Sequence, residues 1–182
     1  SFLSNHRSNG TGLTHTRIPD PSLKIFGGSY LIDDDNIGEF YSLYYDKVFV
    51  QGSQEYLTEQ QLRDDKRAPI AVDIDFRYPI SVNKRQHTED HILDVFDLYL
   101  NTLKSMLKFN SDISFPVWIM QKPNVNRLVD KEVTKDGIHI LFGLQMEHTV
   151  QMMLREKVIN DIGDTSWSEL PNINKWDSVF DD

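Results

Sequence analysis

Two aspartates, Asp73 and Asp75, alternate with apolar residues in the stretch IAVDIDFR at residues 70–77. Apolar residues at every second position predict a β-strand with one buried and one open face, so both carboxylates should point to the same side. Their Cα atoms would lie about 6.6 Å apart, close enough for both side chains to reach one divalent cation or a metal pair. Oxygen-only ligands favour Mg²⁺ or Mn²⁺. The alternative is an acidic pair on a solvated face, because short motifs also occur by chance.

A second candidate is His139, in the stretch GIHILFG at residues 137–143. The alternation predicts a strand with the isoleucines and the phenylalanine on one face and Gly137 and His139 on the other. If this strand pairs with the aspartate strand and the apolar faces align, His139 lies on the carboxylate side. Gly137 would then leave room for a ligand. The alternative is a hydrogen-bonded histidine of the core.

Four further polar residues could contact phosphates or nucleic acid. Arg77 has the same strand parity as the two aspartates, and Lys135 precedes Gly137 by two residues. Arg would neutralise a triphosphate by a bidentate fork and Lys as a point charge, although both could be ordinary exposed cations. His15 and Arg17 lie in a locally basic N-terminal arm and are weaker candidates for template or nucleotide contact.

Several other site types are disfavoured. His87 and His91 have the i, i+4 spacing of zinc ligands, but no Glu follows His87 as in H-E-x-x-H, so we expect solvated histidines at a helix start. The chain has no cysteine, which excludes disulfides and thiolate metal sites. Its glycines do not have the spacing of a G-x-G-x-x-G or Walker loop.

The spacing of apolar residues predicts both helices and strands along the chain. Residues 1–23 are expected to form a loop or an ordered arm, and 36–50 an amphipathic helix. Thr58 would open a short charged helix as half of a capping box with Gln61, and Thr88 would cap a long helix over 89–108. The remaining predicted elements are strands at 70–77, 116–122 and 137–143, a loop at 123–136 and a helix at about 147–161.

Size and charge restrict the class of protein. A chain of 182 residues fits one domain, 1–182, and no apolar run approaches the roughly 20 residues of a membrane helix. A net charge of −9 argues against a nucleic-acid-coating protein. We expect an intracellular protein without a membrane partner. The missing initiator Met and the abrupt end after an apolar pair suggest a segment of a longer chain.

The two motifs together resemble a known family. AVDIDFR at 71–77 followed by KDGIHI at 135–140 is similar to the first two motifs of the archaeo-eukaryotic primase (AEP) superfamily, an Asp-x-Asp and a small-x-His. The similarity is strong to the primase part of the helicase-primases of large DNA viruses, the group that includes the poxvirus protein. Segments 14–17, 27–30, 56–60 and 176–181 also fall in the order of that viral group, so the resemblance covers nearly the whole chain.

The resemblance implies a fold and a site. It implies the α+β AEP fold, with an N-terminal αβ unit and an RRM-like antiparallel sheet that is covered by helices and bears three motifs. The third motif is a hydrophobic residue followed by Asp, and Phe180-Asp181 matches it, with Asp177 and Asp182 as lesser candidates. By this resemblance Asp73, Asp75 and Asp181 would hold two Mg²⁺ or Mn²⁺ ions, and His139 would contact phosphates of the incoming nucleotide.

The implied activity is primer synthesis in viral DNA replication. The domain would transfer nucleotides from NTP or dNTP on a single-stranded DNA template and release pyrophosphate. A helicase domain in the same longer chain, which could be a hexamer, would retain the template, because an acidic domain binds phosphates weakly. The host cytoplasm or the viral replication site is the implied location.

Two alternatives remain at the level of sequence. The first is a sugar-nucleotide transferase, in which an Asp-x-Asp also carries a metal-bound diphosphate. The second is a primase-derived module that has lost activity and serves as a docking or DNA-binding platform of a replicative helicase. The small-x-His strand and the terminal Phe-Asp favour the primase. The sequence leaves the choice between ribo- and deoxyribonucleotides open.

Overall fold

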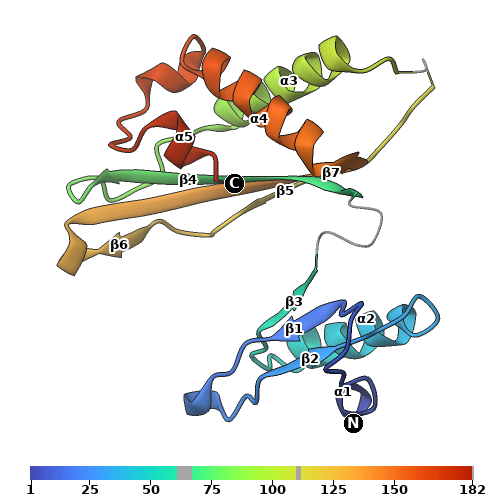
Figure 1. Cartoon of the computed structure of the whole chain (residues 1–182). Helices are drawn as coiled ribbons and strands as arrows, with labels where there is room; N and C mark the ends of the chain where they lie inside the picture. The colour runs from blue at the N-terminus through green and yellow to red at the C-terminus, as the bar shows by residue number, and fades with distance from the viewer. Residues whose placement is uncertain (61–66, 110–111, 182) are drawn as a thin grey trace. The chain divides into compact units, whose positions relative to one another are not determined.

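The computed structural model describes residues 1–60, 67–109 and 112–181, and the chain divides into two compact units, Ser1–Arg67 and Ala68–Asp182. Both units combine helices with antiparallel strands (Figure 1), which confirms the predicted α+β class. The boundary near residue 67 was not predicted from the sequence. The interpretation of residues 1–182 as one catalytic domain stays a prediction.

The first unit is a three-stranded sheet with helices. Its strands β1 (His15–Arg17), β2 (Gly28–Tyr30) and β3 (Leu57–Glu59) pair in the order β2-β1-β3, and both pairs are antiparallel. Phe40 buries its ring with Tyr30 and Ile32 in a small core. The unit also contains α1 (Phe2–Asn5), the 3₁₀ turn Pro21–Leu23, α2 (Ile37–Tyr45) and a π-helical turn over Asp46–Val50.

Two predictions in this unit need correction. Residues 1–23 are more than a loop or arm, since they form α1 and β1. The predicted helix start at Thr58 is wrong, because Thr58 lies in β3 opposite Thr16, where pairing with β1 satisfies the backbone. Its supposed capping partner Gln61 lies outside the described residues. The helix over 36–50 is present, but its last turn is π-helical.

The second unit is a sheet covered on one face by helices (Figure 1). The strands β4 (Arg67–Pro79), β7 (Val133–Glu147) and β5 (Val117–Gln121) are hydrogen-bonded in the order β4-β7-β5, and β6 (Asn126–Leu128) also pairs with β7. The other elements are α3 (Glu89–Met106), a 3₁₀ turn at Val129–Lys131, α4 (His148–Ile162), a 3₁₀ turn at Ser166–Glu169 and α5 (Trp176–Val179).

The even-numbered residues of β4 and β7 form the core of this unit. Ile74 and Phe76 on β4, and Ile138 and Phe142 on β7, are completely buried against the helices. Burying one such side chain contributes about 1.5–3 kcal/mol, so a one-residue slip of either strand would be very costly. The odd-numbered residues therefore point to the other face, which α3 and α4 leave uncovered and which we call the open face.

In the second unit the predicted starts of α3 and α4 agree with the structure, and the predicted loop 123–136 does not. Thr88 and His91 form the two hydrogen bonds of a capping box, so α3 begins where it was predicted. α4 also matches its prediction within one residue. The predicted loop 123–136 is partly wrong, because it contains β6 and the start of β7. β7 extends through this polar sequence with side-chain hydrogen bonds to another segment, such as Thr134 to the Val82 carbonyl at 2.7 Å.

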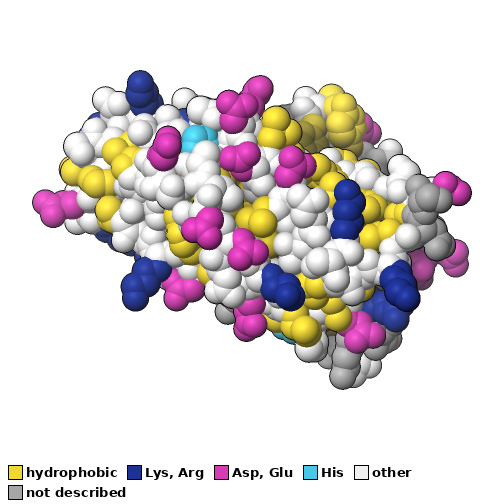
Figure 2. Space-filling view, turned by 90° about the horizontal axis from the view of Figure 1, so that it is seen from above, with side chains coloured by type: hydrophobic (Ala, Val, Ile, Leu, Met, Phe, Trp, Pro, Cys, Tyr) yellow, Lys and Arg dark blue, Asp and Glu magenta, His cyan; other side chains and the backbone are white. Residues whose placement is uncertain are grey.

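None of the helices in the described residues combines the length and the apolar character needed to cross a membrane. Figure 2 views the molecule from the side on which α3 and α4 lie. Acidic side chains are spread among basic ones there, and the described residues form no continuous basic surface on the face in view.

Candidate active site

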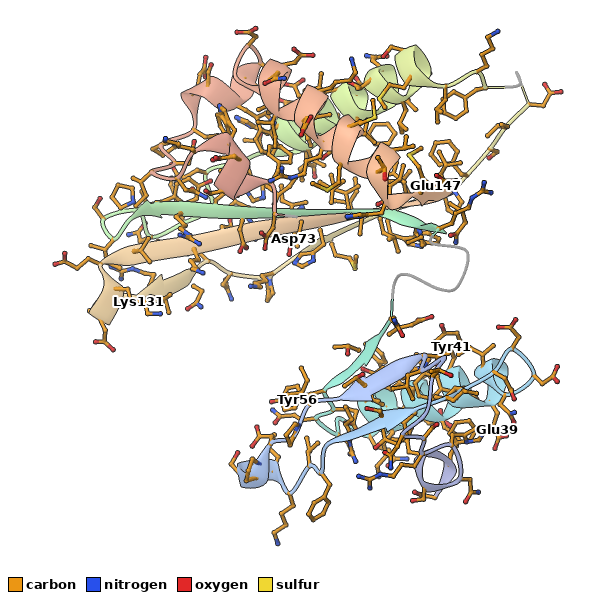
Figure 3. The ribbon with its side chains drawn as sticks, in the orientation of Figure 1. Glu39, Tyr41, Tyr56, Asp73, Lys131 and Glu147 are labelled. Carbon is orange, nitrogen blue, oxygen red and sulfur yellow. The ribbon has the colours of Figure 1, made fainter. Side chains whose placement is uncertain are left out.

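The open face carries the residues of the first two sequence motifs. Asp73 and Asp75 lie on β4 with the parity opposite to that of the buried residues, and Figure 3 shows Asp73 on the side of the sheet away from α3 and α4. His139 lies on β7 with the matching parity. The side chain of Asp73 is 44% exposed and that of His139 is 52% exposed, so both are accessible to a ligand.

Pairing of β4 with β7 brings the two motifs together. His139 Nε2 lies 3.5 Å from Asp73 Oδ1. Gly137, two residues before His139, lies against Ile74 and Asp75, so the strands run antiparallel with 137 beside 75 and 139 beside 73. The structure thus places the histidine on the carboxylate side of the sheet, as the alternation of both strands predicted.

Gly137 permits this close approach of the strands. A Cβ atom at this position would lie 2.9 Å from the backbone oxygen of Ile74 and 3.3 Å from Asp75 Oδ1. The first distance is shorter than real side chains show, and the atom it meets belongs to a strand. Any larger residue would therefore push β4 away or displace the Asp75 carboxylate.

The third acidic motif also lies beside Asp73. The backbone N–H of Asp181 donates to the carbonyl of Asp73 at 2.9 Å, and Phe180 forms an antiparallel bridge with Ile74. Arg155 of α4 fixes this terminal segment by donating to the carbonyls of Asp177 at 2.8 Å and Phe180 at 3.1 Å. Asp177 itself is exposed on α5, and Asp182 lies outside the described residues.

The electrostatics of Asp73 reflect this gathering of acids. Burial raises the pKa of Asp73 above its ordinary value, and the charges of Asp75 and Asp181 raise it further, while His139 and Lys122 oppose the shift. Asp73 Oδ1 is buried and has no hydrogen-bond partner within the described part of the chain. A carboxylate in this position repels its neighbours, and a bound cation would relieve that repulsion.

The carboxylates are not arranged as a finished metal centre. Among the residues that the structure describes, no three His, Asp or Glu side chains are grouped as ligands of one ion. This also holds for His87 and His91, whose spacing resembles that of zinc ligands. Like-charged side chains separate when no cation lies between them, so the acids at this site share a sheet face without converging.

Positive charge lies at one end of the open face. Arg77 is exposed on β4, and Lys135 is half-buried on β7, opposite Asn126 of β6. Lys122, the residue after β5, lowers the pKa of Asp73 and is therefore a third cation of the site. Sequence analysis missed Lys122, because its distance from Asp73 depends on the pairing of β5 with β7 and not on any motif.

His15 and Arg17 lie in the first unit. The His15 side chain is buried, packs edge-on against Phe40 at 4.7 Å and contacts Thr14 Oγ1 at 2.9 Å through Nδ1. Arg17 forms a bidentate pair with Glu55 at 2.7 and 2.6 Å, and that carboxylate raises the pKa of Arg17. Contact of either residue with a template stays a prediction, and it would require both to leave their present partners.

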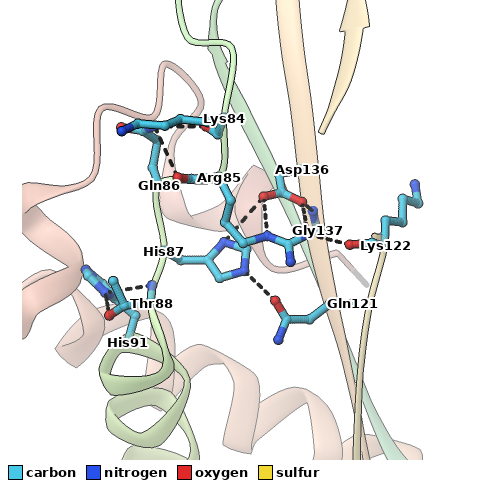
Figure 4. Close-up of polar contacts among 10 residues, drawn as sticks. All are labelled: Lys84, Arg85, Gln86, His87, Thr88, His91, Gln121, Lys122, Asp136 and Gly137. Atoms are coloured by element: carbon cyan, nitrogen blue, oxygen red, sulfur yellow. Dashed lines mark hydrogen bonds and ion pairs between the residues drawn. The ribbon is translucent and has the colours of Figure 1, made fainter. Parts of the chain in front are cut away.

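A buried polar cluster supports the start of the Gly137–His139 segment (Figure 4). The carboxylate of Asp136 is fully buried, accepts two bonds from Arg85 at 2.9 and 3.0 Å, and accepts the backbone N–H of Gly137 at 3.0 Å. His87 lies beside it, with Nδ1 3.6 Å from Asp136 Oδ2 and Nε2 3.0 Å from Gln121 Oε1. The cluster ties the segment before α3 to β5 and β7.

The prediction of solvated histidines is therefore wrong for His87. The residue is 4% exposed, its ring stacks on Phe76 at 5.2 Å, and burial lowers its pKa. His91 is a capping residue, whose Nδ1 accepts the backbone N–H of Thr88 at 3.2 Å. Sequence reasoning missed Asp136 as a structural residue; the only available signal was a charged residue at a position of buried parity.

Comparison with known proteins agrees with the motifs. Residues 19–182 match the family model described as the N-terminal AEP domain of the C962R protein. No curated protein matches the chain. The family match supports a primase-related role in nucleotidyl transfer during viral replication, with DNA and nucleotides as the ligands that such a role implies. The chain belongs to the C962R-type family of N-terminal archaeo-eukaryotic primase domains.

Proposed function

We propose that the chain is a DNA primase or primase-polymerase domain that extends a primer on single-stranded DNA with NTP or dNTP. The observation that carries this proposal is the meeting of Asp73 and His139 on the open face, 3.5 Å apart, with the backbone of Asp181 bonded to Asp73. Asp73, Asp75 and His139 therefore share the open face, and the backbone of Asp181 adjoins Asp73.

The acidic residues fit divalent ions by their chemistry. Asp73, Asp75 and Asp181 would hold Mg²⁺ or Mn²⁺, because their oxygens are hard ligands and because Asp73 Oδ1 accepts no hydrogen bond in the described chain, with only the His139 imidazole 3.5 Å away. When bound, the ions would neutralise the triphosphate and activate the primer 3′-hydroxyl.

The other residues of the open face would bind and orient the nucleotide. His139, half exposed beside Asp73, would donate to a phosphate oxygen, and Gly137 would let β4 lie close enough to keep the Asp75 carboxylate beside β7. Arg77, Lys122 and Lys135 would bind the triphosphate and stabilise the charge of the leaving pyrophosphate. In the reaction the primer 3′-oxygen bonds to the α-phosphorus while the bond to pyrophosphate breaks.

The proposal includes a partner for the template. The chain has a net charge of −9, and the helical face of the second unit offers no continuous basic surface among its described residues. Phosphate neutralisation supplies most non-specific affinity for DNA, so the isolated domain should bind its template weakly. A helicase in the same longer chain, in the form of a ring or hexamer, would retain the template at the viral replication site.

The test is incorporation of labelled nucleotides on a poly-pyrimidine template with Mn²⁺. Replacing Asp73 and Asp75 with Asn should abolish synthesis and leave the fold intact. The matched control replaces two exposed acids of the same unit, Asp97 and Asp130, with Asn, which changes the net charge equally. Full activity of the D73N/D75N variant would refute the site, and an inactive parent chain would favour a docking module. Turnover of a sugar donor without template would favour a sugar-nucleotide transferase.

A further inference from the structure

The open face continues past His139 into an exposed apolar surface. On β5, Met120 pairs with His139 and Trp118 pairs with Leu141, and residues opposite one another in an antiparallel pair point to the same side. Trp118 and Met120 are each 50% exposed. We call Trp118, Met120 and Leu141 the apolar shelf.

The charges of the open face are ordered along the strands. The pairing places Arg77 and Lys135 at one end, Asp75 and Gly137 next, then Asp73 with His139 and Met120. Trp118 and Leu141 follow one row further on. Successive rows are about 6.6 Å apart, so the surface changes from cationic to acidic to apolar over a few residues.

This order matches the parts of a nucleotide. A triphosphate would lie between the cations and the bound metal, and the base would extend from it in the opposite direction. Trp118 is the diagonal neighbour of His139 across the β5–β7 pair, and such neighbours lie about 7–8 Å apart. The indole ring of Trp118, at that distance from His139, is within reach of the base of a nucleotide whose phosphate contacts His139.

We propose that the apolar shelf is the base-binding subsite of the incoming nucleotide, with Trp118 as the stacking residue. The inference rests on the proposed function, because His139 and the acids locate the triphosphate. Aromatic stacking accepts every base through its π-face, which suits an enzyme that must use four nucleotides. Met120 would adapt to purine or pyrimidine by its flexible thioether side chain.

The test compares ligands that contain or lack a base. Binding of ATP, dATP and inorganic tripolyphosphate to the 182-residue chain is measured with Mn²⁺ for the parent, Trp118→Ala and Trp118→Phe. Stacking energies measured by alanine substitution predict that W118A binds ATP and dATP about 5- to 150-fold more weakly, with tripolyphosphate binding unchanged. W118F should retain most of the affinity, because it keeps an aromatic face.

The matched control is Ile119→Ala, on the same strand but opposite Ile140, and so on the other face of the sheet. It should bind all three ligands like the parent. Equal binding by W118A and the parent would overturn the inference and leave the proposed function standing. Equal weakening of tripolyphosphate would also overturn it, by indicating a distorted triphosphate site.

Two further results distinguish other sources of failure. If W118A weakens an oligo-dT strand but not ATP or dATP, the shelf binds the template, and the assignment to the incoming nucleotide is wrong. If the parent chain binds no triphosphate with Mn²⁺, the proposed function fails together with this inference. Quenching of tryptophan fluorescence by ATP that is lost in W118F, while affinity is retained, would show that Trp118 itself contacts the base.

Discussion

The backbone N–H of Asp181 donates to the carbonyl of Asp73 at 2.9 Å, so the end of the described chain is attached to the strand of the first motif. This bond places the third acid beside the first two without using any carboxylate oxygen. Both groups in this bond belong to the backbone, so it fixes the separation of Asp181 from Asp73 along the strand without involving the Asp73 carboxylate. The attachment itself depends on Arg155, whose guanidinium holds the carbonyls of Asp177 and Phe180.

Arg155→Met should therefore reduce synthesis more than it reduces stability. It removes charge-assisted hydrogen bonds, each of which contributes about 1.5–3 kcal/mol. The loss of stability should be smaller than their sum, because the partly exposed carbonyls can bond to water instead. We expect loss of at least about tenfold in nucleotide incorporation, with a modest fall in the urea midpoint. Lys157→Met, an exposed cation on the same helix, is the control and should change neither quantity.

Gly137→Ala should distort the site by steric contact. The new methyl would lie 2.9 Å from the Ile74 oxygen, and such overpacking costs about 1–3 kcal/mol. Urea unfolding followed by tryptophan fluorescence reports on the second unit, because Trp118, Trp167 and Trp176 all lie there. Gly38→Ala, where nothing lies within 4 Å, is the control and should leave this transition unchanged. An unaffected G137A variant would contradict the close approach.

Sequence patterns were sufficient to predict which residues lie on the open face, because strand alternation decides which side of a sheet each residue occupies. The parity of Asp73, Asp75 and His139 followed from their buried neighbours, and the start of α3 followed from Thr88. The α+β class followed from the resemblance of the motifs to the AEP superfamily. Periodicity and capping are local properties, and local rules predict them well.

The parts that were missed depend on contacts between distant residues. Lys122 acts on the pKa of Asp73 only because the register of β5 against β7 brings the two residues near each other. β7 extends through polar sequence because Asp136 forms an ion pair with Arg85, which lies in another segment. His87 was predicted to be solvated because it precedes the cap of α3 and lacks the neighbouring Glu of a zinc motif, but it stacks on Phe76 and its Nε2 lies 3.0 Å from Gln121 Oε1. Tertiary partners, which no local pattern reveals, decide whether a polar residue is buried.

Asp73→Asn should stabilise the metal-free protein at neutral pH. Burial and neighbouring acids raise the pKa of Asp73, so the folded state favours its protonated form, and the ionised form costs stability above that pKa. The cost disappears as the pH falls through the raised pKa. We expect a gain below about 1 kcal/mol near pH 7 in EDTA, since the group is partly exposed, and no gain at acid pH.

Mn²⁺ should make the parent protein more stable than D73N, the reverse of their order in EDTA. Binding to the folded state alone stabilises by mass action, so the melting temperature of the parent should rise with Mn²⁺ and that of D73N should rise less. Asp97→Asn, on the exposed face of α3, should respond like the parent at every pH. A parent protein whose melting temperature is insensitive to Mn²⁺ at millimolar concentration would contradict metal binding at Asp73.

Arg85→Met should be the most destabilising of these substitutions. It would leave the carboxylate of Asp136, which has no exposed surface, without its cation, and breaking a buried ion pair in this way costs about 3–5 kcal/mol. His87 would not replace the lost charge at neutral pH, because burial lowers its pKa. Arg127→Met is the control, since Arg127 donates one exposed hydrogen bond to the Ile80 carbonyl before the same segment. The two variants are compared by urea unfolding at pH 7, and a cost for R85M no larger than for R127M would mean that the buried cluster does not hold β7 in place.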